Sequence, residues 1–364
     1  MELQSEILRP PVHSLPRTDS DIRVHELTPD YEGAWNDYVA EAADCSPFHE
    51  LGWMRAVERI YRHRPRYLVA SSGSGRLMGV LPLFEVAGPF TGRALISVPY
   101  AVSGGASAVN EAVATALHDR TKLLAERMSV RYAEIRAADP IAGFSSKNDY
   151  VSFRKPIPDY PKDVLDTYPR KARAAVRNAI KRFGLQSRFG HELLDEFYKL
   201  YALSLRRLGS PPHAKSFFRE LLHEFGDRCI VQLVYHEGRA IAGVISFRFQ
   251  HEILPYWAGI DVRYNHTNAS NFLYYSLMEH AIGLKLEIFD FGRTRIDNEG
   301  GCRFKIHQGF DPLPLAYSTY SPAGTPPPDL RPSNRKFGIA QAVWRRLPLG
   351  VVTMSAKTVT RWLP

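Results

Sequence analysis

One order of predicted elements occurs twice in this sequence, and that repetition constrains the fold more than any other feature. In each half, helices are followed by a hairpin, a strand, a loop, a long helix and a closing strand. The first half is predicted to contain helices at 31–42, 49–61 and 109–128 and strands at 22–27, 67–70, 77–86, 94–98, 130–136 and 150–154. The second half is predicted to contain helices at 169–183, 192–208, 214–225 and 269–284 and strands at 229–235, 240–249, 253–260 and 286–291. Such internal repetition favours two α/β (α+β) units in tandem.

A short local signature supports the duplication. The hairpin residues 75–84, Gly-Arg-Leu-Met-Gly-Val-Leu-Pro-Leu-Phe, align with residues 238–247, Gly-Arg-Ala-Ile-Ala-Gly-Val-Ile-Ser-Phe, after one inserted residue. By itself this match does not establish duplication, because two unrelated hairpins could both contain Gly-Arg and Gly-Val. Together with the repeated order it favours duplication, and a chain of 364 residues suits two domains of about 150 residues each. The boundary is predicted near 156–161, between domains at 21–157 and 158–320.

The composition is that of a folded protein without a secretory or membrane-spanning segment. Hydrophobic residues make up 45% of the chain and aromatic residues 12%, enough for two packed interiors. The three cysteines, Cys45, Cys229 and Cys302, are far apart, which fits a reducing compartment and predicts no metal site. No apolar run reaches the roughly 18 residues that a membrane span needs. We therefore expect a cytoplasmic protein, with residues 1–20 disordered.

The positive charge is concentrated at the C-terminus. Residues 331–364 contain seven basic and no acidic residues, so only two of the nine net positive charges fall to the rest of the chain. A Pro-rich linker is predicted at 321–333 and a basic amphipathic tail at 334–364, with Phe337, Ala340, Val343, Trp344 and Leu347 on one helical face. Two interpretations stay open: residues 335–363 bind an anionic membrane surface, or the tail packs on its own domain.

Polar residues cluster just after the last predicted strand, where open α/β sheets place ligands. Asp290 alternates with Phe289 and Phe291, so its carboxylate projects from the opposite face and must be paired or face a cleft. It is predicted either to take a proton from an amine or to hold Arg293 or Arg295. These two arginines could grip phosphate bidentately, or could form loop ion pairs with Asp297 or Glu299.

A second basic group lies on the helix at 169–183. Arg170, Arg173 and Arg177 recur at intervals of three and four residues and therefore share one helical face. Such a face suits the phosphates of tRNA or of a lipid-linked pyrophosphate. The alternative is a solvated basic face with no ligand.

The stretch Phe289-Asp290-Phe291-Gly292-Arg293, followed by Phe304-Lys305 and Gly309-Phe310, resembles the second domain of FemAB-like proteins. These are tandem-domain relatives of the GNAT acyltransferases, so the resemblance implies two tandem GNAT-like domains. The segments 81–83, 169–173 and 344–349 further resemble the FemAB-like subgroup associated with exosortase/PEP-CTERM and exopolysaccharide loci. The resemblance covers about residues 22–364.

The resemblance implies an N-acyl or aminoacyl transferase that acts on an amine of a cell-envelope or exopolysaccharide precursor. Lys305 matches the family's lysine and would stabilise the oxyanion that such a reaction forms, with Phe304 beside it. The donor is either acyl-CoA or aminoacyl-tRNA: the loop 263–270, which contains Asn268, lacks the glycine that usually admits a CoA pyrophosphate. No metal is implied.

A non-catalytic adaptor, binding a polysaccharide precursor or an assembly partner at the membrane, is the alternative function. The presence of Asp290, Arg293 and Lys305 together favours the enzyme, because a site without chemistry has little need for cations beside a carboxylate. For either function we expect a location in the cytoplasm or on the inner face of the membrane.

Overall fold

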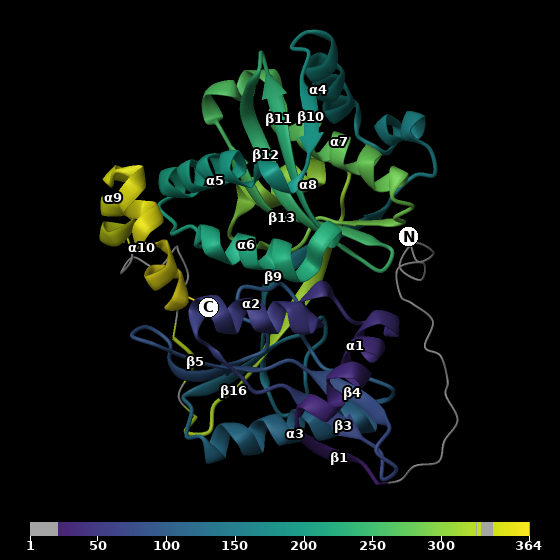
Figure 1. Cartoon of the computed structure of the whole chain (residues 1–364), viewed down its shortest axis with the longest axis vertical. Helices are drawn as coiled ribbons and strands as arrows, with labels where there is room; N and C mark the ends of the chain where they lie inside the picture. The colour runs from purple at the N-terminus through teal and green to yellow at the C-terminus, as the bar shows by residue number, and fades with distance from the viewer. Residues whose placement is uncertain (1–20, 325, 329–337, 364) are drawn as a thin grey trace. The chain divides into compact units, whose positions relative to one another are not determined.

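The computed structural model describes residues 21–324, 326–328 and 338–363, in two compact units (Figure 1). The first unit comprises the described residues within 1–58, 63–146 and 317–327, and the second those within 59–62, 147–316 and 328–364. The chain thus enters the second unit before the predicted 156–161 boundary and later returns to the first. The predicted disorder of 1–20 and part of the predicted linker lie outside the described residues, as does Phe337 of the predicted tail face.

The first unit contains two groups of strands and three α-helices among its described residues. The helices are α1 (Glu32–Glu41), α2 (Leu51–Tyr61, whose last turn falls in the second unit) and α3 (Glu111–Arg127). One sheet has the order β1-β3-β4-β7, formed by β1 (Arg23–Glu26), β3 (Leu68–Ser71), β4 (Leu77–Leu81) and β7 (Ser107–Ala108). The other strands pair in the order β2-β5-β6-β8, formed by β2 (Arg64–Pro65), β5 (Phe84–Gly88), β6 (Gly92–Ile96) and β8 (Tyr132–Arg136).

The predicted strand at 77–86 is in fact two strands that belong to different sheets. β4 ends at Leu81 and β5 begins at Phe84, with Pro82 between them. Proline has no amide hydrogen to donate to a neighbouring strand, so the ladder stops there. The hydrophobic pattern runs through this break and conceals it.

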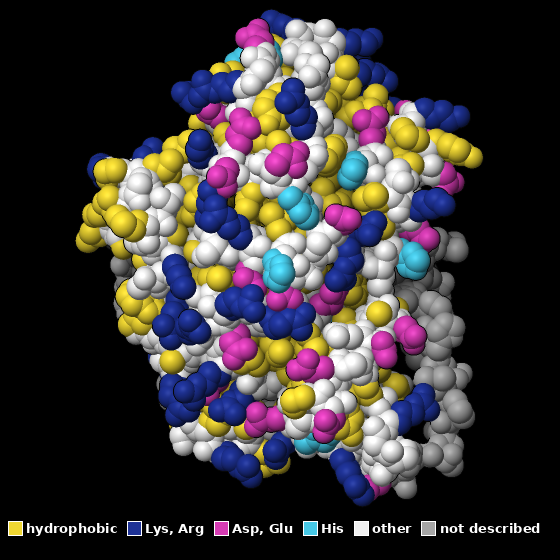
Figure 2. All heavy atoms as spheres, in the orientation of Figure 1, with side chains coloured by type: hydrophobic (Ala, Val, Ile, Leu, Met, Phe, Trp, Pro, Cys, Tyr) yellow, Lys and Arg dark blue, Asp and Glu magenta, His cyan; other side chains and the backbone are white. Residues whose placement is uncertain are grey.

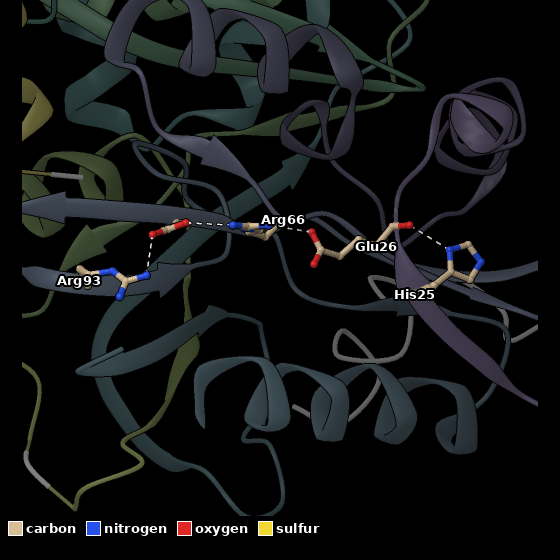
Figure 3. A network of polar contacts seen from close by, with 5 residues as sticks. His25, Glu26, Arg66 and Arg93 are labelled. Carbon is tan, nitrogen blue, oxygen red and sulfur yellow. Dashed lines mark hydrogen bonds and ion pairs between the residues drawn. The ribbon is translucent and has the colours of Figure 1, made fainter. Parts of the chain in front are cut away.

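A chain of ion pairs joins the two sheets of the first unit (Figure 3). Arg66 pairs with Glu26 of β1 and with Glu85 of β5, both at 3.3 Å, and Arg93 of β6 pairs with Glu85 at 3.0 Å. His25 contacts the backbone oxygen of Glu26 at 2.9 Å. The charged side chains in this network pair with one another between strands, so we assign the network a structural role.

The second unit is built on one sheet with helices on both faces. Its strands pair in the order β10-β11-β12-β13-β14-β9, formed by β10 (Gln186–Phe189), β11 (Cys229–His236), β12 (Arg239–Phe249), β13 (Glu252–Ile260), β14 (Ile288–Asp290) and β9 (Ser145–Pro156). The short β15 (Thr294–Arg295) also pairs with β9. The strand β16 (Pro312–Tyr320), like β9, passes from one unit to the other. Strands β10 and β16 were not predicted from the sequence.

Two pairs of helices cover this sheet (Figure 1). The helices α4 (Arg170–Lys181) and α7 (Ala269–Gly283) share a hydrophobic core with one face, whereas α5 (Leu194–Leu208) and α6 (Lys215–Phe225) pack on the other. The α5 backbone lies very close to β13, because a Cβ added to Gly259 would lie 2.4 Å from the backbone nitrogen of Tyr201. Glycine at 259 is therefore required by the packing.

Both units contain a pair of parallel strands joined by a helix. In the first unit α3 joins β6 to β8, and in the second α7 joins β13 to β14. The second pair is joined only at Glu252 with Ile288 and Ile253 with Phe289, although β13 continues to Ile260. The two strands therefore separate beyond Phe289. This separation puts the end of β14 and the loop after it at an opening between neighbouring strands.

Two helices form the described part of the tail. They are α9 (Gly338–Arg346) and α10 (Leu349–Arg361), and both pack against α5. The buried residues Val352, Ala356 and Thr360 recur every four positions along α10. One face of the tail therefore packs on its own unit, as one of the two sequence interpretations expected.

Candidate active site at the end of β14

The chain turns sharply after Asp290, the last residue of β14. Gly292 has a φ of +66°, a conformation that glycine adopts without the steric cost other residues incur. Its backbone N–H donates to the Asp290 carboxylate at 2.7 Å. The acid at the strand end thus stabilises the turn that follows it.

Lys305 reaches the same turn from the helix α8 (Glu299–His307), whose first turn is capped by the Asn298 side chain. Its ammonium donates to the carbonyl oxygens of Phe291 at 2.6 Å, Gly292 at 2.9 Å and Arg293 at 3.3 Å. Burial lowers the pKa of Lys305 to about 8. All three ammonium hydrogens therefore have acceptors in this structure, and the cation lies in a largely apolar surrounding.

Asp290 faces Arg154, a charged side chain from a distant part of the sequence. Arg154 lies across the β14–β9 pair with its Nε 3.6 Å from the Asp290 carboxylate, and it also pairs with Glu252 of β13. Burial raises the pKa of Asp290, and the nearby Arg154, the Gly292 N–H and Lys305 offset only part of that effect. Such an acid holds a proton more readily than an exposed aspartate, as a general base needs.

Arg293 and Arg295 lie beside Tyr150 of β9. The guanidinium carbons are 4.5 Å and 5.4 Å from the centre of that ring. Arg295 also pairs with Asp297 at 2.9 Å, one of the two predicted ion-pair partners, while Glu299 pairs with Arg303 instead. The two arginines thus share an aromatic support, and Arg295 already has a carboxylate partner.

The remaining predicted site residues lie at other places in the second unit. Phe304 packs against both Tyr274 and Phe291, with ring centres 5.8 Å and 6.2 Å away. Asn268 precedes the first residue of α7 in the left-handed conformation, with a φ of 61°, and its side chain makes no capping hydrogen bond. It belongs to the loop 263–270 that the sequence proposes for the donor, whose last two residues start α7 in the structure.

The basic face of α4 forms a separate feature. Arg170 and Arg177 are exposed, and Arg173 pairs with Asp166 at 3.3 Å. Within the described residues, no hydrogen bond or ion pair joins Arg170, Arg173 or Arg177 to the Asp290–Lys305 stretch. These arginines therefore form no direct polar contact with the Asp290–Lys305 stretch in the part of the chain that the structure describes.

Sequence reasoning missed Arg154, Glu252 and a second buried lysine. Lys155 donates to the carbonyl oxygen of Gln308 at 3.1 Å and to the Thr167 hydroxyl at 3.2 Å, and burial lowers its pKa to about 7. One signal was present: Arg154 ends the predicted strand 150–154 and Lys155 follows it directly. If the strand continues, the two side chains point to opposite faces and one must be covered.

The described residues contain neither a candidate metal site nor a helix that could span a membrane. No cluster of three or more His, Cys, Asp or Glu side chains suited to a metal ion occurs among them. No described helix is both long and apolar enough to cross a bilayer.

Comparison with known proteins identifies the fold of this site. Residues 170–306, which include α4 to α8, match the family described as acetyltransferase (GNAT) domain. The chain has a tandem GNAT fold. The second unit is thus an acyltransferase-type domain, and the predicted fold class is confirmed. The sequence matches no curated protein.

Solved structures that resemble this fold include three with low sequence identity. FemX aligns with a TM-score of 0.63 at 14% identity, covering 81% of this chain and 96% of that one. L-PGS from Bacillus licheniformis gives 0.53 at 15% identity, covering 88% and 97%. A tandem GNAT protein from the clavulanic acid biosynthesis pathway gives 0.52 at 13% identity, covering 84% and 100%. The agreement extends over both units and concerns the fold.

Proposed function

We propose that this protein is an N-acyltransferase or aminoacyltransferase of FemAB type, with its reaction centre at Asp290 and Lys305. The observation that carries the proposal is a half-buried acid and a half-buried ammonium converging on one turn, where two parallel strands of a GNAT-type domain separate. Each of the two groups has a protonation equilibrium suited to amine acylation, because the pKa of the acid is raised and that of the lysine is lowered.

In the proposed reaction an acceptor amine attacks the carbonyl carbon of a thioester or ester. Asp290 takes the proton that the amine loses, and Arg154 keeps the carboxylate oriented. Lys305 donates to the oxyanion of the tetrahedral intermediate by exchanging one carbonyl partner, of which Arg293 at 3.3 Å is the most distant. Collapse forms the amide and expels the thiol or hydroxyl leaving group, which receives a proton.

The donor carries phosphates, as acyl-CoA and aminoacyl-tRNA both do. We propose that Arg293 and Arg295, supported by Tyr150, bind phosphate near the reacting carbonyl, and that Asn268 and Phe304 contact the donor. The exposed arginines Arg170 and Arg177, with Arg173, would hold a more distant phosphate, as a polynucleotide donor would provide.

The acceptor is proposed to be an amine-bearing precursor of the cell envelope or of an exopolysaccharide. The similarity in fold to FemX and L-PGS and the motifs shared with the exosortase/PEP-CTERM-associated subgroup support this choice. Such precursors are assembled at a membrane, so we place the protein in the cytoplasm at the inner membrane face.

Donor binding is the test. Native mass spectrometry and thermal unfolding are measured with acetyl-CoA, longer acyl-CoAs, charged tRNA and undecaprenyl-linked sugars, for the wild type and for Arg293→Ala. Transfer assays with Lys305→Gln and Asp290→Asn follow. We expect one donor class to stabilise the wild type saturably. Transfer should fall about a hundredfold or more in the Lys305 and Asp290 variants, as for removal of an oxyanion donor. Lys199→Gln, an exposed lysine on α5, is the matched control.

Full transfer activity in Lys305→Gln would remove the assigned role of this lysine. Absence of binding to every donor, with a precursor sugar still bound, would instead support the adaptor function.

A further inference from the structure

The outward side of the C-terminal helix pair is an apolar and basic surface. Four aliphatic side chains are largely exposed there: Ile339 at 81%, Val343 at 54%, Val351 at 41% and Met354 at 80%. Figure 2 shows hydrophobic side chains gathered at the left edge of the molecule, where α9 and α10 lie in Figure 1. Scattered single aliphatic residues are ordinary on a protein surface, but four on one short helix pair require an explanation.

The charged residues around these four aliphatic side chains are all basic. The helix pair carries Arg345, Arg346, Lys357 and Arg361, all exposed, and no acidic residue occurs from 330 to 364. A face of this kind, with aliphatic side chains among basic ones, is typical of helices that lie in a membrane interface. Two copies of this face would repel each other, because each brings only positive charge.

The structure divides the predicted apolar face between solvent and the protein. Val343 is exposed, whereas Trp344 and Leu347 are partly buried, and the Trp344 indole nitrogen is fully covered. Ile339, Val351 and Met354 are exposed in their place. The reason is that α9 uses the other side to pack on α5.

Hydrogen bonds fasten the helix pair to its own unit at the junction of the two helices and near the end of α10. The Thr360 hydroxyl donates to the Pro212 carbonyl at 2.8 Å, and the Arg345 guanidinium donates to the Leu208 carbonyl at 3.3 Å. Arg206 of α5 donates in turn to the Leu347 carbonyl at 3.2 Å. The exposed side chains are therefore held outward on a fixed surface.

We infer that the outward face of α9 and α10 docks the second unit on an anionic lipid bilayer, with Ile339, Val343, Val351 and Met354 inserted among headgroups and the basic residues against lipid phosphates. This inference extends the proposed location at the membrane and rests on the described surface, not on the transfer reaction. A bilayer supplies both the apolar and the anionic contacts that this face can make.

The test is co-sedimentation of the full chain with vesicles of phosphatidylcholine, with or without phosphatidylglycerol. Binding should require phosphatidylglycerol and weaken as salt rises. The triple variant Arg346→Gln, Lys357→Gln, Arg361→Gln should bind on the order of a hundredfold more weakly, since each basic residue near such a surface contributes roughly fivefold. The pair Ile339→Ser and Met354→Ser should also weaken binding without disturbing the fold, because both side chains are exposed.

Matched controls are available at exposed positions outside the tail. Arg127→Gln, Arg131→Gln and Lys147→Gln remove the same charge from exposed positions, and Leu123→Ser removes an apolar side chain that is 56% exposed. Controls that bind as weakly as the patch variants, or patch variants that bind like the wild type, would overturn the inference. So would a wild type that binds no vesicle or that uses this face to form dimers. Donor stabilisation, measured on the same samples, reports separately on the proposed function.

Discussion

At the end of β14 the pKa values of Asp290 and Lys305 are both shifted in the direction that favours the neutral form of the side chain. Burial raises the pKa of Asp290 and lowers that of Lys305. Both groups form hydrogen bonds with the backbone of Gly292. A displacement of the Asp290 carboxylate would therefore move the carbonyl oxygen that Lys305 binds. The chemistry we propose uses the ionised form of both, and pH should therefore control it from both sides.

The pH dependence of transfer should show the charge state of Lys305. Its pKa of about 8 means that the ammonium is lost as pH rises through that value, well below the ordinary 10.5. The kcat/KM of the wild type should accordingly fall above about pH 8, whereas Lys305→Arg should keep its residual activity to higher pH because guanidinium stays charged. A wild-type profile that stays level up to the ordinary lysine value would contradict the role of a cationic Lys305.

Lys155 predicts a pH dependence of stability. Its pKa is about 7 in the folded protein and 10.5 ordinarily, so between these values the unfolded chain binds the extra proton and the free energy of unfolding rises with pH. Relative to Lys155→Met, the wild type should gain up to about 1.4 kcal/mol per pH unit in this window. Urea unfolding of both proteins from pH 6 to 10 measures the difference.

The exposed Lys147 provides the control for this comparison. Lys147→Met should follow the wild type in parallel at every pH. If Lys155→Met also runs parallel to the wild type, the lysine is not neutral in the folded protein.

At the scale of elements, the decisive contact is the one between α5 and β13. Helices usually pack on sheets through side chains, but here the α5 backbone comes against Gly259. Gly243 of β12 is similarly crowded, since an added Cβ would lie 3.2 Å from the Phe197 ring of α5. The helix is thereby held close to the sheet on the face that carries Asp290 and Arg154.

Gly259→Ala should therefore destabilise the second unit. The new methyl group would overlap the Tyr201 backbone, and relieving the overlap by moving α5 should cost about 1–3 kcal/mol of unfolding free energy. Thermal or urea unfolding checks this, with Gly283→Ala as control because nothing lies within 4 Å of a Cβ there. An unchanged stability in Gly259→Ala would mean that α5 is not held at this distance.

At the scale of the whole molecule, the tail belongs to the folded second unit and is not a free extension. The α10 face formed by Val352, Ala356 and Thr360 is buried, and the Thr360 hydroxyl is bonded to the α5–α6 loop at Pro212. A tail attached in this way stabilises the loop that it contacts as well as the unit as a whole.

Thr360→Val tests this attachment with little change in shape. The buried Pro212 carbonyl loses its donor, and the unfolding free energy should fall by about 1–3 kcal/mol. Thr358→Val, at an exposed position two residues earlier, should leave the melting temperature almost unchanged. Equal melting temperatures for the two variants would show that the tail does not contribute to the stability of this unit.

The sequence by itself determined the tandem α/β fold class, most helices of both units and the polar stretch from Asp290 to Lys305. These are set by local periodicity and by residues close in the chain, which a sequence shows directly. It did not reveal the break at Pro82, or the strands β10 and β16, whose apolar patterns are short or interrupted.

Only the tertiary structure decided which groups meet. Arg154 reaches Asp290 through the pairing of β9 with β14, across 136 positions of sequence, and Lys155 is buried because Thr167 and Gln308 close over it. The same is true of the tail, because only its packing on α5 decided which of its apolar side chains are covered. Such contacts depend on strand register and on burial, and both arise only when distant segments are brought together.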